Sequence, residues 1–327
     1  LTLARIEGAP AGTKGISLFA IPKYRLTDAG DLEPNDVTTA GDFQKMGQRG
    51  YCTTHLVFGE RDDCRGWLVG APHHGLKYMF KMMNEARIAV GRGAAAIATA
   101  AYYASLQYAR ERPQGRRLER GGKKDLASEQ TLIIKHPDVR RMLLLQKAVT
   151  EGALSLLLQS CYYDDRRLTT TDETAENDHL LLELLTPVSK TYPSEMGILS
   201  TSQSIQCLGG YGYCEDFPVE QYFRDARIHP IHEGTTGIQG MDLLGRKVIM
   251  ADGKAFQLYL KTVRETVRKA AEGPEFLKDF ANQLETALTS LETVTFNLIG
   301  VAQSKGPAAY LADATLYLEF FGIITVA

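Results

Sequence analysis

The sequence is poor in cysteine and tryptophan, and its few cysteines follow no recognisable pattern. Among 327 residues there are five cysteines and one tryptophan. The cysteines are Cys52, Cys64, Cys161, Cys207 and Cys214, and no two of them form a C-x-x-C pair. An odd number without such pairs argues against a disulfide framework and against a thiolate zinc site, and it favours a reducing compartment.

Neither sign of charge is in excess, and no long apolar run is present. Lys and Arg number 37 and Asp and Glu number 39, which gives a net charge of −2. A balance this close to zero provides no overall attraction to nucleic acid or to an anionic membrane. The longest weakly polar stretch, residues 93–106, is mostly alanine and is shorter than the ~20 residues of a membrane span. We therefore expect a soluble protein without a signal peptide, a membrane partner or a nucleic-acid partner.

The two ends lack the usual features of chain termini. The sequence begins without Met, on residues 1–6 that alternate like a strand, and it closes on the apolar run 320–327. An exposed run of this kind would promote aggregation. We therefore expect the chain to be a piece of a longer one.

The chain changes character near Gly75, from strand-like to helical. Strand formers dominate residues 15–21 and 53–58. Helices are expected over about 75–112, 136–163, 178–191, 194–208 and 218–227, from about 238 onward, and three times within 254–327. The predicted fold class is α+β and mostly α. Residues 1–70 would end a β domain, residues 71–250 would form a four-helix bundle domain, and residues 251–327 a helical extension.

Two predicted loops carry opposite charge. Residues 110–124 hold seven basic and two acidic residues, and residues 164–178 hold six acidic and two basic ones. The basic loop could contact phosphate, although such a segment is more often a plain surface loop.

Two motifs that resemble known binding sites lack the context those sites need. Residues 91–96 fit the dinucleotide pattern G-x-G-x-x-A, but they lie within a helical stretch and not after a strand. His229 and His232 could share a helix face as metal ligands. Pro230 between them favours a loop, however, and no third ligand is evident. We therefore expect neither a dinucleotide fold nor a metal site.

Two glycine-containing segments are better candidates for chemistry. Residues 206–213 end a helix in a glycine-rich turn, and a helix cap explains one of its glycines but not three. Closely spaced glycines allow the backbone to approach a ligand. Residues 233–237 (EGTTG) place a carboxylate at the start of a helix. Because Thr236 could cap that helix, Glu233 would be free for chemistry.

In order and spacing, these motifs resemble the acyl-CoA dehydrogenase family over roughly residues 1–250. The matching stretches are KMGQRG (45–50), GWLVG (66–70), FKMMNEARIAVGRGA (80–94), YARERPQG (108–115), QCLGGYGY (206–213) and FRDARIHPIHEGTTGIQ (223–239). The helical tail resembles the extension of a long subgroup that includes 3-methylmercaptopropionyl-CoA dehydrogenases.

The resemblance implies an enzyme of fatty-acid β-oxidation that binds FAD and forms a homodimer or homotetramer. Such enzymes dehydrogenate an acyl-CoA thioester between its α and β carbons, and an electron-transfer flavoprotein accepts the electrons. The setting would be a bacterial cytoplasm or a mitochondrial matrix.

By the same resemblance, Glu233 is the catalytic base that removes the α-proton. Its own backbone N–H would bind the thioester oxygen. Gly234 would lie against the substrate, and the predicted flavin contacts are Thr235, Thr236 and Gly237. The predicted contacts to the FAD of the adjacent subunit are Arg112, Gln114, Gln206, Gly209 and Gly210. The acyl-CoA helix would contribute Asn84 and Arg87.

The sequence departs from the family pattern near Gly115, where the usual aromatic residue is missing and residues 116–134 lengthen the following loop. By resemblance, the segment that seats the flavin would precede Leu1. Three alternatives stay open: an acyl-CoA oxidase with the same base, a nucleic-acid-associated flavoprotein of the alkylation-response branch, and a catalytically inactive helical scaffold.

Overall fold

The chain divides into two units, which are described separately. The computed structural model describes residues 1–116, 121–122 and 127–327, and the side chain of Asn84 lies outside the described part. The basic loop predicted at 110–124 therefore falls partly outside it. The first unit is Leu1–Ala86 and the second is Arg87–Ala327. Because the division falls inside a long helix, the domain boundary predicted at residue 70 stays a prediction.

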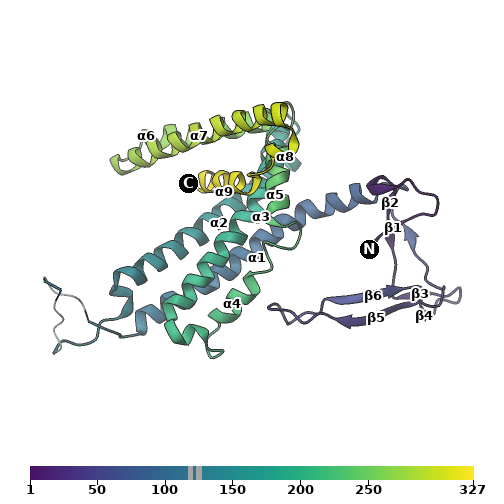
Figure 1. Ribbon diagram of the computed structural model, residues 1–327, viewed down its shortest axis with the longest axis horizontal. Coiled ribbons are helices and arrows are strands. Elements are labelled where there is room, and N and C mark those ends of the chain that lie inside the picture. Colours follow the sequence, from purple (N-terminus) through teal and green to yellow (C-terminus); the bar gives the residue numbers. More distant parts are fainter. Residues whose placement is uncertain (117–120, 123–126) are drawn as a thin grey trace. The chain divides into compact units, whose positions relative to one another are not determined.

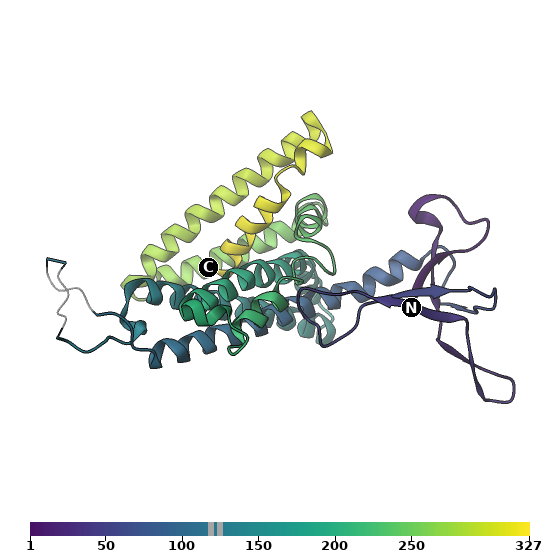
Figure 2. The same cartoon turned by 60° about the horizontal axis from the view of Figure 1, so that its bottom comes forward.

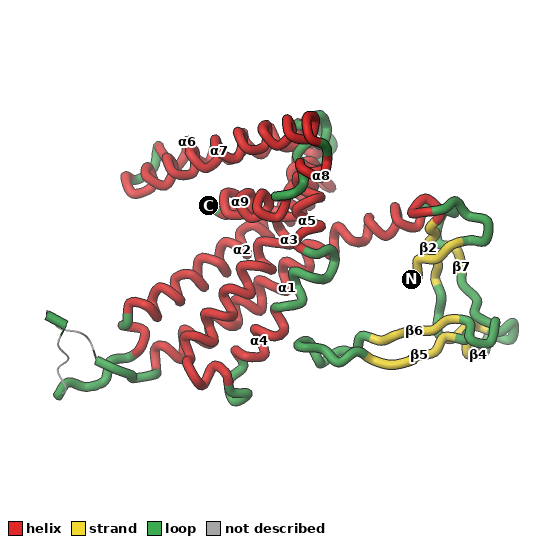
Figure 3. The backbone as a smooth tube through the Cα atoms, in the orientation of Figure 1, coloured by secondary structure: helices red, strands yellow, loops and turns green. Residues whose placement is uncertain are grey.

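The first unit is made of short antiparallel strands (Figure 3). The strands are β1 (Thr2–Arg5), β2 (Ile16–Ala20), β3 (Tyr24–Leu26), β4 (Leu32–Pro34), β5 (Val37–Asp42), β6 (Thr54–Phe58) and β7 (Trp67–Leu68). They pair in the order β1-β2-β7, β3-β4 and β5-β6. The predicted strands at 15–21 and 53–58 correspond to β2 and β6. A buried Arg25 links this unit through ion pairs of 2.6 Å to Glu33 and 2.5 Å to Asp63.

The rest of the described chain is helical (Figure 1). The helices are α1 (Gly75–Glu111), α2 (Pro137–Thr169), α3 (Glu173–Leu208), α4 (Val219–Ala226), α5 (Thr236–Asp242), α6 (Lys254–Ala271), α7 (Glu275–Lys305), α8 (Pro307–Tyr310) and α9 (Ala314–Val326). Helices α1, α2 and α3 run side by side, and α6 and α7 form a hairpin (Figure 2). Short sheets followed by long helices confirm the predicted fold class.

Helix α3 is one continuous helix, so the two helices and the acidic loop predicted in this region are wrong. Helix α2 continues to Thr169, and α3 begins at Glu173 after Asp172, whose carboxylate accepts the N–H of Thr174 at 2.9 Å. Pro187 and Pro193 lie inside α3 and are buried. A proline normally breaks a helix because it lacks an N–H and crowds the preceding turn. Burial among other helices lets α3 tolerate both.

Pro193 shapes the contact between α1 and α3. It leaves the carbonyl of Ser189 without the usual N–H partner four residues on. Gly91 of α1 packs against this carbonyl so closely that a Cβ at residue 91 would lie 2.0 Å from the oxygen. The first glycine of the G-x-G-x-x-A motif thus permits close helix packing.

One apolar cluster joins the bundle to the predicted extension. Its buried members include Leu184 and Val188 of α3, Leu243 and Leu244 after α5, Phe256 and Leu260 of α6, Leu288 and Leu291 of α7, and Leu318 and Phe321 of α9. The cluster extends across the boundary predicted at residues 250 and 251, which stays a prediction. The segment Pro307–Val326 is long and apolar enough to cross a membrane. Part of its apolar surface lies in this cluster, as is common for a core helix.

Candidate active site

The turns between α4 and α5 hold Glu233 in an unusual backbone conformation. Glu233 has φ of 55° and Gly234 has φ of 94°. For a residue with a side chain, a left-handed conformation costs about 1–2 kcal/mol, whereas glycine adopts it freely. Space also requires glycine at 234, because a Cβ there would lie 2.5 Å from Nε2 of Gln239. A strained turn of this kind needs support from the residues around it.

Two buried side chains provide that support. The Nζ of Lys190, from the middle of α3, donates to the carbonyl oxygen of Gly234 at 2.8 Å. The Nε2 of Gln239, from α5, donates to the carbonyl oxygen of Glu233 at 3.0 Å. Both side chains are fully buried. Nε2 of Gln239 also lies 3.5 Å from the Gly234 carbonyl oxygen, so the two consecutive carbonyls of the turn are bound from α3 and from α5.

Charged and titratable groups surround this turn. Burial lowers the pKa of Lys190 to about 8, against the opposing attraction of Glu195 and Glu233. Burial also lowers the pKa of His229 and of His232, which favours their neutral forms. The two imidazole rings lie 5.5 Å apart. Over the residues that the structure describes, no group of three or more His, Cys, Asp or Glu side chains could hold a metal ion.

Glu233 itself has two polar groups available. Its side chain is half-buried. Among the described residues, neither a hydrogen bond nor an ion pair engages its carboxylate, and no acceptor binds its backbone N–H. One residue thus offers a carboxylate that can accept a proton and an N–H that can donate a hydrogen bond.

The neighbouring threonines point in different directions. Thr235 is exposed and occupies the N-cap position of α5 without a side-chain capping bond. The hydroxyl of Thr236 donates to the carboxylate of Glu195 on α3. The prediction that Thr236 caps the helix is therefore wrong, because its hydroxyl binds α3. Gly237 faces Thr315, whose Oγ1 would lie 3.9 Å from a Cβ at residue 237.

Arg87 forms a buried ion pair beneath this loop. Its Nη1 lies 2.9 Å from Oδ2 of Asp242, and both side chains are 7% exposed. The Nη1 of Arg246 lies 3.4 Å from the other oxygen of Asp242. Arg87 is thus close to the candidate site but engaged with α5, and its contact with substrate stays a prediction. The side chain of Asn84 lies outside the described residues.

The second set of predicted residues gathers where α1 and α3 end. The guanidinium of Arg112 lies 5.6 Å from the ring centre of Tyr211, in the glycine-rich turn. Its Nε is buried and has no partner in the described part of the chain. Gln206, Gly209 and Gly210 are exposed, and a Cβ at either glycine would meet nothing within 4 Å.

The loop after α1 is held by its own contacts. Gln114 is exposed, and its carbonyl oxygen lies 2.7 Å from Nε2 of His136. Gly115 follows Gln114 directly, with φ of 69°, so no aromatic residue stands between them. Within the described residues, this set therefore combines a guanidinium whose Nε has no hydrogen-bond partner, that of Arg112, with open backbone.

The two sets lie far apart along α3. Lys190, which binds the Glu233 turn, precedes Gln206 by sixteen positions. At a rise of 1.5 Å per residue this separates them by about 24 Å. A single small group therefore cannot touch both sets.

Sequence reasoning missed the residues that support Glu233. Lys190, Gln239 and Glu195 were not among the predicted site residues. Lys190 could have been noticed, because it follows the largely apolar run 180–188, and a lysine beside such a run is rarely buried without a partner. The positions of Gln239 and Glu195 depend on tertiary packing and had no local signal.

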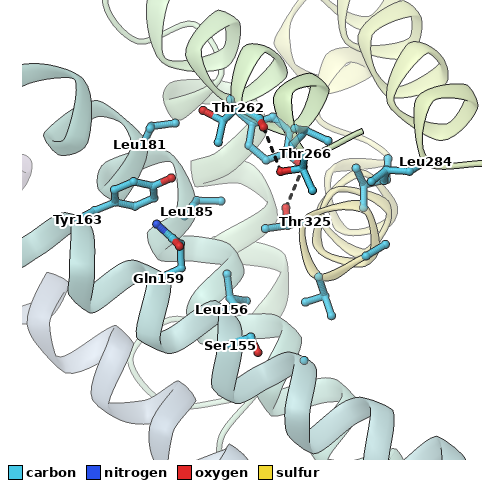
Figure 4. Close-up of a pocket in the computed structure, with 16 residues that line it drawn as sticks. Ser155, Leu156, Gln159, Tyr163, Leu181, Leu185, Thr262, Thr266, Leu284 and Thr325 are labelled. Atoms are coloured by element: carbon cyan, nitrogen blue, oxygen red, sulfur yellow. Dashed lines mark hydrogen bonds between the residues drawn. The ribbon is translucent and has the colours of Figure 1, made fainter. Parts of the chain in front are cut away.

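Two of the cavities in the described part of the chain lie along α3. A cavity of about 330 Å³ lies among α2, α3, α6, α7 and α9. In Figure 4, Gln159 and Tyr163 line it from α2, Thr262 and Thr266 from α6, and Thr325 from α9. None of the predicted site residues lines it. A second cavity of about 360 Å³ lies between α3 and α9, and Glu195 and Thr236 line it beside the Glu233 turn.

The chain is similar to two families of known domains. Residues 123–249 match the family described as "Acyl-CoA dehydrogenase, C-terminal domain". Residues 259–327 match the family described as "Acetyl-CoA dehydrogenase C-terminal like". The first match includes Glu233 and the glycine-rich turn, and the second covers α7, α8 and α9 with most of α6.

Similar proteins carry the same family name over nearly the whole chain. A butyryl-CoA dehydrogenase of Syntrophomonas wolfei is 36% identical over 301 residues, which are 90% of this chain and 48% of that protein. A 3-methylmercaptopropionyl-CoA dehydrogenase of Ruegeria pomeroyi is 35% identical over 95% of this chain and 52% of that protein. The chain spans about half the length of these relatives.

A solved structure shares the fold. The acyl-CoA dehydrogenase of Bacillus anthracis, crystallised in complex with FAD, matches with a TM-score of 0.70. The match covers 95% of this chain and 54% of that one, at 20% identity. At this identity the likeness concerns the fold alone.

Proposed function

The chain belongs to the acyl-CoA dehydrogenase family, and from this premise we propose that it supplies the catalytic base of a FAD-dependent acyl-CoA dehydrogenase. The substrate is an acyl-CoA thioester, which loses a proton from its α carbon and a hydride from its β carbon. Glu233 takes the proton. The proposal covers the whole protein, of which this chain corresponds to about half by comparison with its relatives.

The observation that carries the proposal is the pair of free groups on Glu233. A thioester α-proton is weakly acidic, so its removal needs a base within reach and a donor for the oxygen that becomes negative. The carboxylate of Glu233 meets the first need and its unpaired backbone N–H meets the second. Contact of Gly234 with the thioester is part of the proposal by resemblance.

FAD fits the residues present at the ends of α1 and α3. The buried, unpaired Nε of Arg112 and the open backbone at Gly209 and Gly210 suit a phosphate group. Gln114 and Gln206 are exposed beside them and can bind polar edges of the cofactor. When bound, FAD accepts the hydride.

An assembly of more than one copy is what the resemblance to the family implies. By that resemblance, the Arg112 set would hold the FAD of an adjacent subunit, while Thr235, Thr236 and Gly237 approach the FAD near Glu233. We propose a homodimer or homotetramer on this basis. Electrons leave to an electron-transfer flavoprotein, and the setting is a bacterial cytoplasm or a mitochondrial matrix.

Arg87 has a supporting part in this proposal. Its ion pair with Asp242 fixes α5 against α1, and α5 follows directly after Glu233. That Asn84 and Arg87 contact the acyl-CoA, as the resemblance implies, stays part of the proposal.

The test is the Glu233→Gln variant of the full-length holoprotein. The amide keeps the shape of the side chain but cannot take a proton. We expect anaerobic bleaching of the flavin by acyl-CoA to fall at least 1,000-fold while flavin content is unchanged. Acyl-CoAs of several chain lengths are compared in the same assay.

The matched control is Glu275→Gln, at an exposed position in the first turn of α7. It should bleach at the wild-type rate. If Glu233→Gln also bleaches at that rate, the base lies elsewhere and the proposal is wrong.

A further inference from the structure

The side chain of Lys190 is an unusual feature of the helical unit. It is the largest fully buried side chain there, and it comes from the middle of α3, eighteen positions before the end of that helix. Removing an ammonium group from water is costly unless bonds in the interior replace those to water. A buried lysine in this position therefore needs an explanation beyond packing.

The ammonium group of Lys190 binds the turn that carries the candidate base. The Nζ donates to the carbonyl oxygen of Gly234 at 2.8 Å, and Glu233 lies close enough to attract the ammonium group. Gln239 donates to the preceding carbonyl, that of Glu233, at 3.0 Å. These two donors hold the two consecutive peptide groups that flank the Cα of Gly234, directly after the base.

Without these hydrogen bonds, the backbone of the Glu233–Gly234 turn would relax to a less strained conformation. Glu233 and Gly234 are both left-handed, with φ of 55° and 94°. A left-handed residue with a side chain persists only when its surroundings hold it. Rotation of this turn would move the carboxylate and the backbone N–H of Glu233 together, and both are needed in the proposed reaction.

We propose that Lys190 is a positioning residue for the proposed dehydrogenation, acting with Gln239 to hold the Glu233–Gly234 turn in the conformation that the base requires. The inference rests on the proposed function, and it adds that the geometry of the base is set from α3 as well as α5. Lys190 touches the loop backbone and not the reacting atoms.

The test is Lys190→Met in the full-length holoprotein. Methionine has a similar volume, and exchanging a buried charge for an apolar group is often tolerated by a fold. The Gly234 carbonyl loses its shorter hydrogen bond, that of 2.8 Å, and keeps only the 3.5 Å contact with Nε2 of Gln239. We expect the maximal rate of flavin bleaching to fall about 10–100-fold, as is typical when a catalytic group is misplaced by about an ångström. The KM for acyl-CoA should change by less than about threefold, because binding contacts remain.

A second measurement does not depend on the flavin. Hydrogen exchange of the amides in residues 228–240 should be faster in Lys190→Met than in the wild type, with or without FAD. Exchange in the first two turns of α3 should be unchanged. A purely structural loss would speed exchange in both segments.

Lys247→Met is the matched control, since Lys247 is also buried but pairs with Glu183 and does not touch the turn. It should lower stability while leaving the bleaching rate per bound flavin unchanged. If Lys190→Met does not fold, Gln239→Met takes its place, with the same slowing and the same faster exchange expected.

The outcomes separate the two proposals. If wild type bleaches and Lys190→Met bleaches at the same rate, the positioning role is overturned and the function stands. If neither protein bleaches although both hold FAD, the proposed function fails, and exchange of residues 228–240 alone decides the role of Lys190: faster exchange supports it and unchanged exchange overturns it.

Discussion

Arg87 and Asp242 are 155 positions apart in the sequence, and their side chains form a buried ion pair of 2.9 Å between α1 and α5. Removing one member of such a pair leaves an unpaired charge in the interior, which is far more costly than losing an exposed pair.

Asp242→Asn should therefore lower the free energy of unfolding by about 3–5 kcal/mol. Urea denaturation followed by circular dichroism measures this change. Asp279→Asn, at an exposed position on α7, should change it by less than about 0.5 kcal/mol. Equal midpoints for the two variants would show that the buried pair does not stabilise the unit.

Gly91→Ala should destabilise the helical unit, although alanine is the better helix former. The new Cβ would lie 2.0 Å from the Ser189 carbonyl oxygen, so α1 and α3 would have to separate. Overpacking of this kind typically costs about 1–3 kcal/mol. Thermal unfolding measures the effect.

The control for that substitution is Gly300→Ala in α7, where a Cβ would meet nothing within 4 Å. There the change should raise stability by about 0.5–1 kcal/mol, because alanine loses less backbone entropy than glycine. A stabilising Gly91→Ala would contradict the close packing of α1 against α3.

Arg112→Ala should weaken FAD binding without changing the bleaching rate per bound flavin. Losing a charge-assisted bond to phosphate costs about 1.5–3 kcal/mol, or about one to two decades in affinity. Flavin content after extensive dialysis measures the loss. Arg110→Ala, an exposed neighbour at the end of α1, should keep its flavin. Equal flavin content in both variants would mean that the loop after α1 does not reach the cofactor.

Lys190 should make stability depend on pH in a defined direction. Its pKa is about 8 in the folded protein, against 10.5 for a free lysine, because burial outweighs the attraction of Glu195 and Glu233. Between these values the unfolded chain holds a proton that the folded protein has released, so the unfolding free energy rises with pH.

We expect this rise to be about 1 kcal/mol between pH 7 and pH 9, measured as the difference between wild type and Lys190→Met. The difference isolates Lys190 from other groups that titrate in this range. Parallel curves for the two proteins would contradict a lowered pKa.

The sequence predicted the long helices well, because their apolar periodicity and their turn residues are local signals. It failed at α3, where a break was expected between residues 191 and 194, because burial between other helices lets α3 continue through Pro193. The strands β3, β4, β5 and β7 were not predicted individually, since they are short and mostly exposed.

The candidate site likewise combines residues that a local motif predicts with residues that only the fold brings together. Glu233 and the glycine-rich turn were found because their motifs are contiguous in the sequence. Lys190 contacts the Glu233 turn at a residue 44 positions away in the sequence. Arg87 contacts α5 at a residue 155 positions away. No local pattern contains such pairs, so only the folded chain could identify them.

The apolar cluster that α9 shares with α3, α6 and α7 affects how the protein can be divided. Phe321 of α9 and Leu184 of α3 are completely buried in it, and Tyr310 donates to the Leu244 carbonyl next to α5. A cut at residue 250 would therefore expose a wide apolar surface beside the candidate base. The bundle and the extension should melt in a single calorimetric transition, with the calorimetric and van't Hoff enthalpies in agreement.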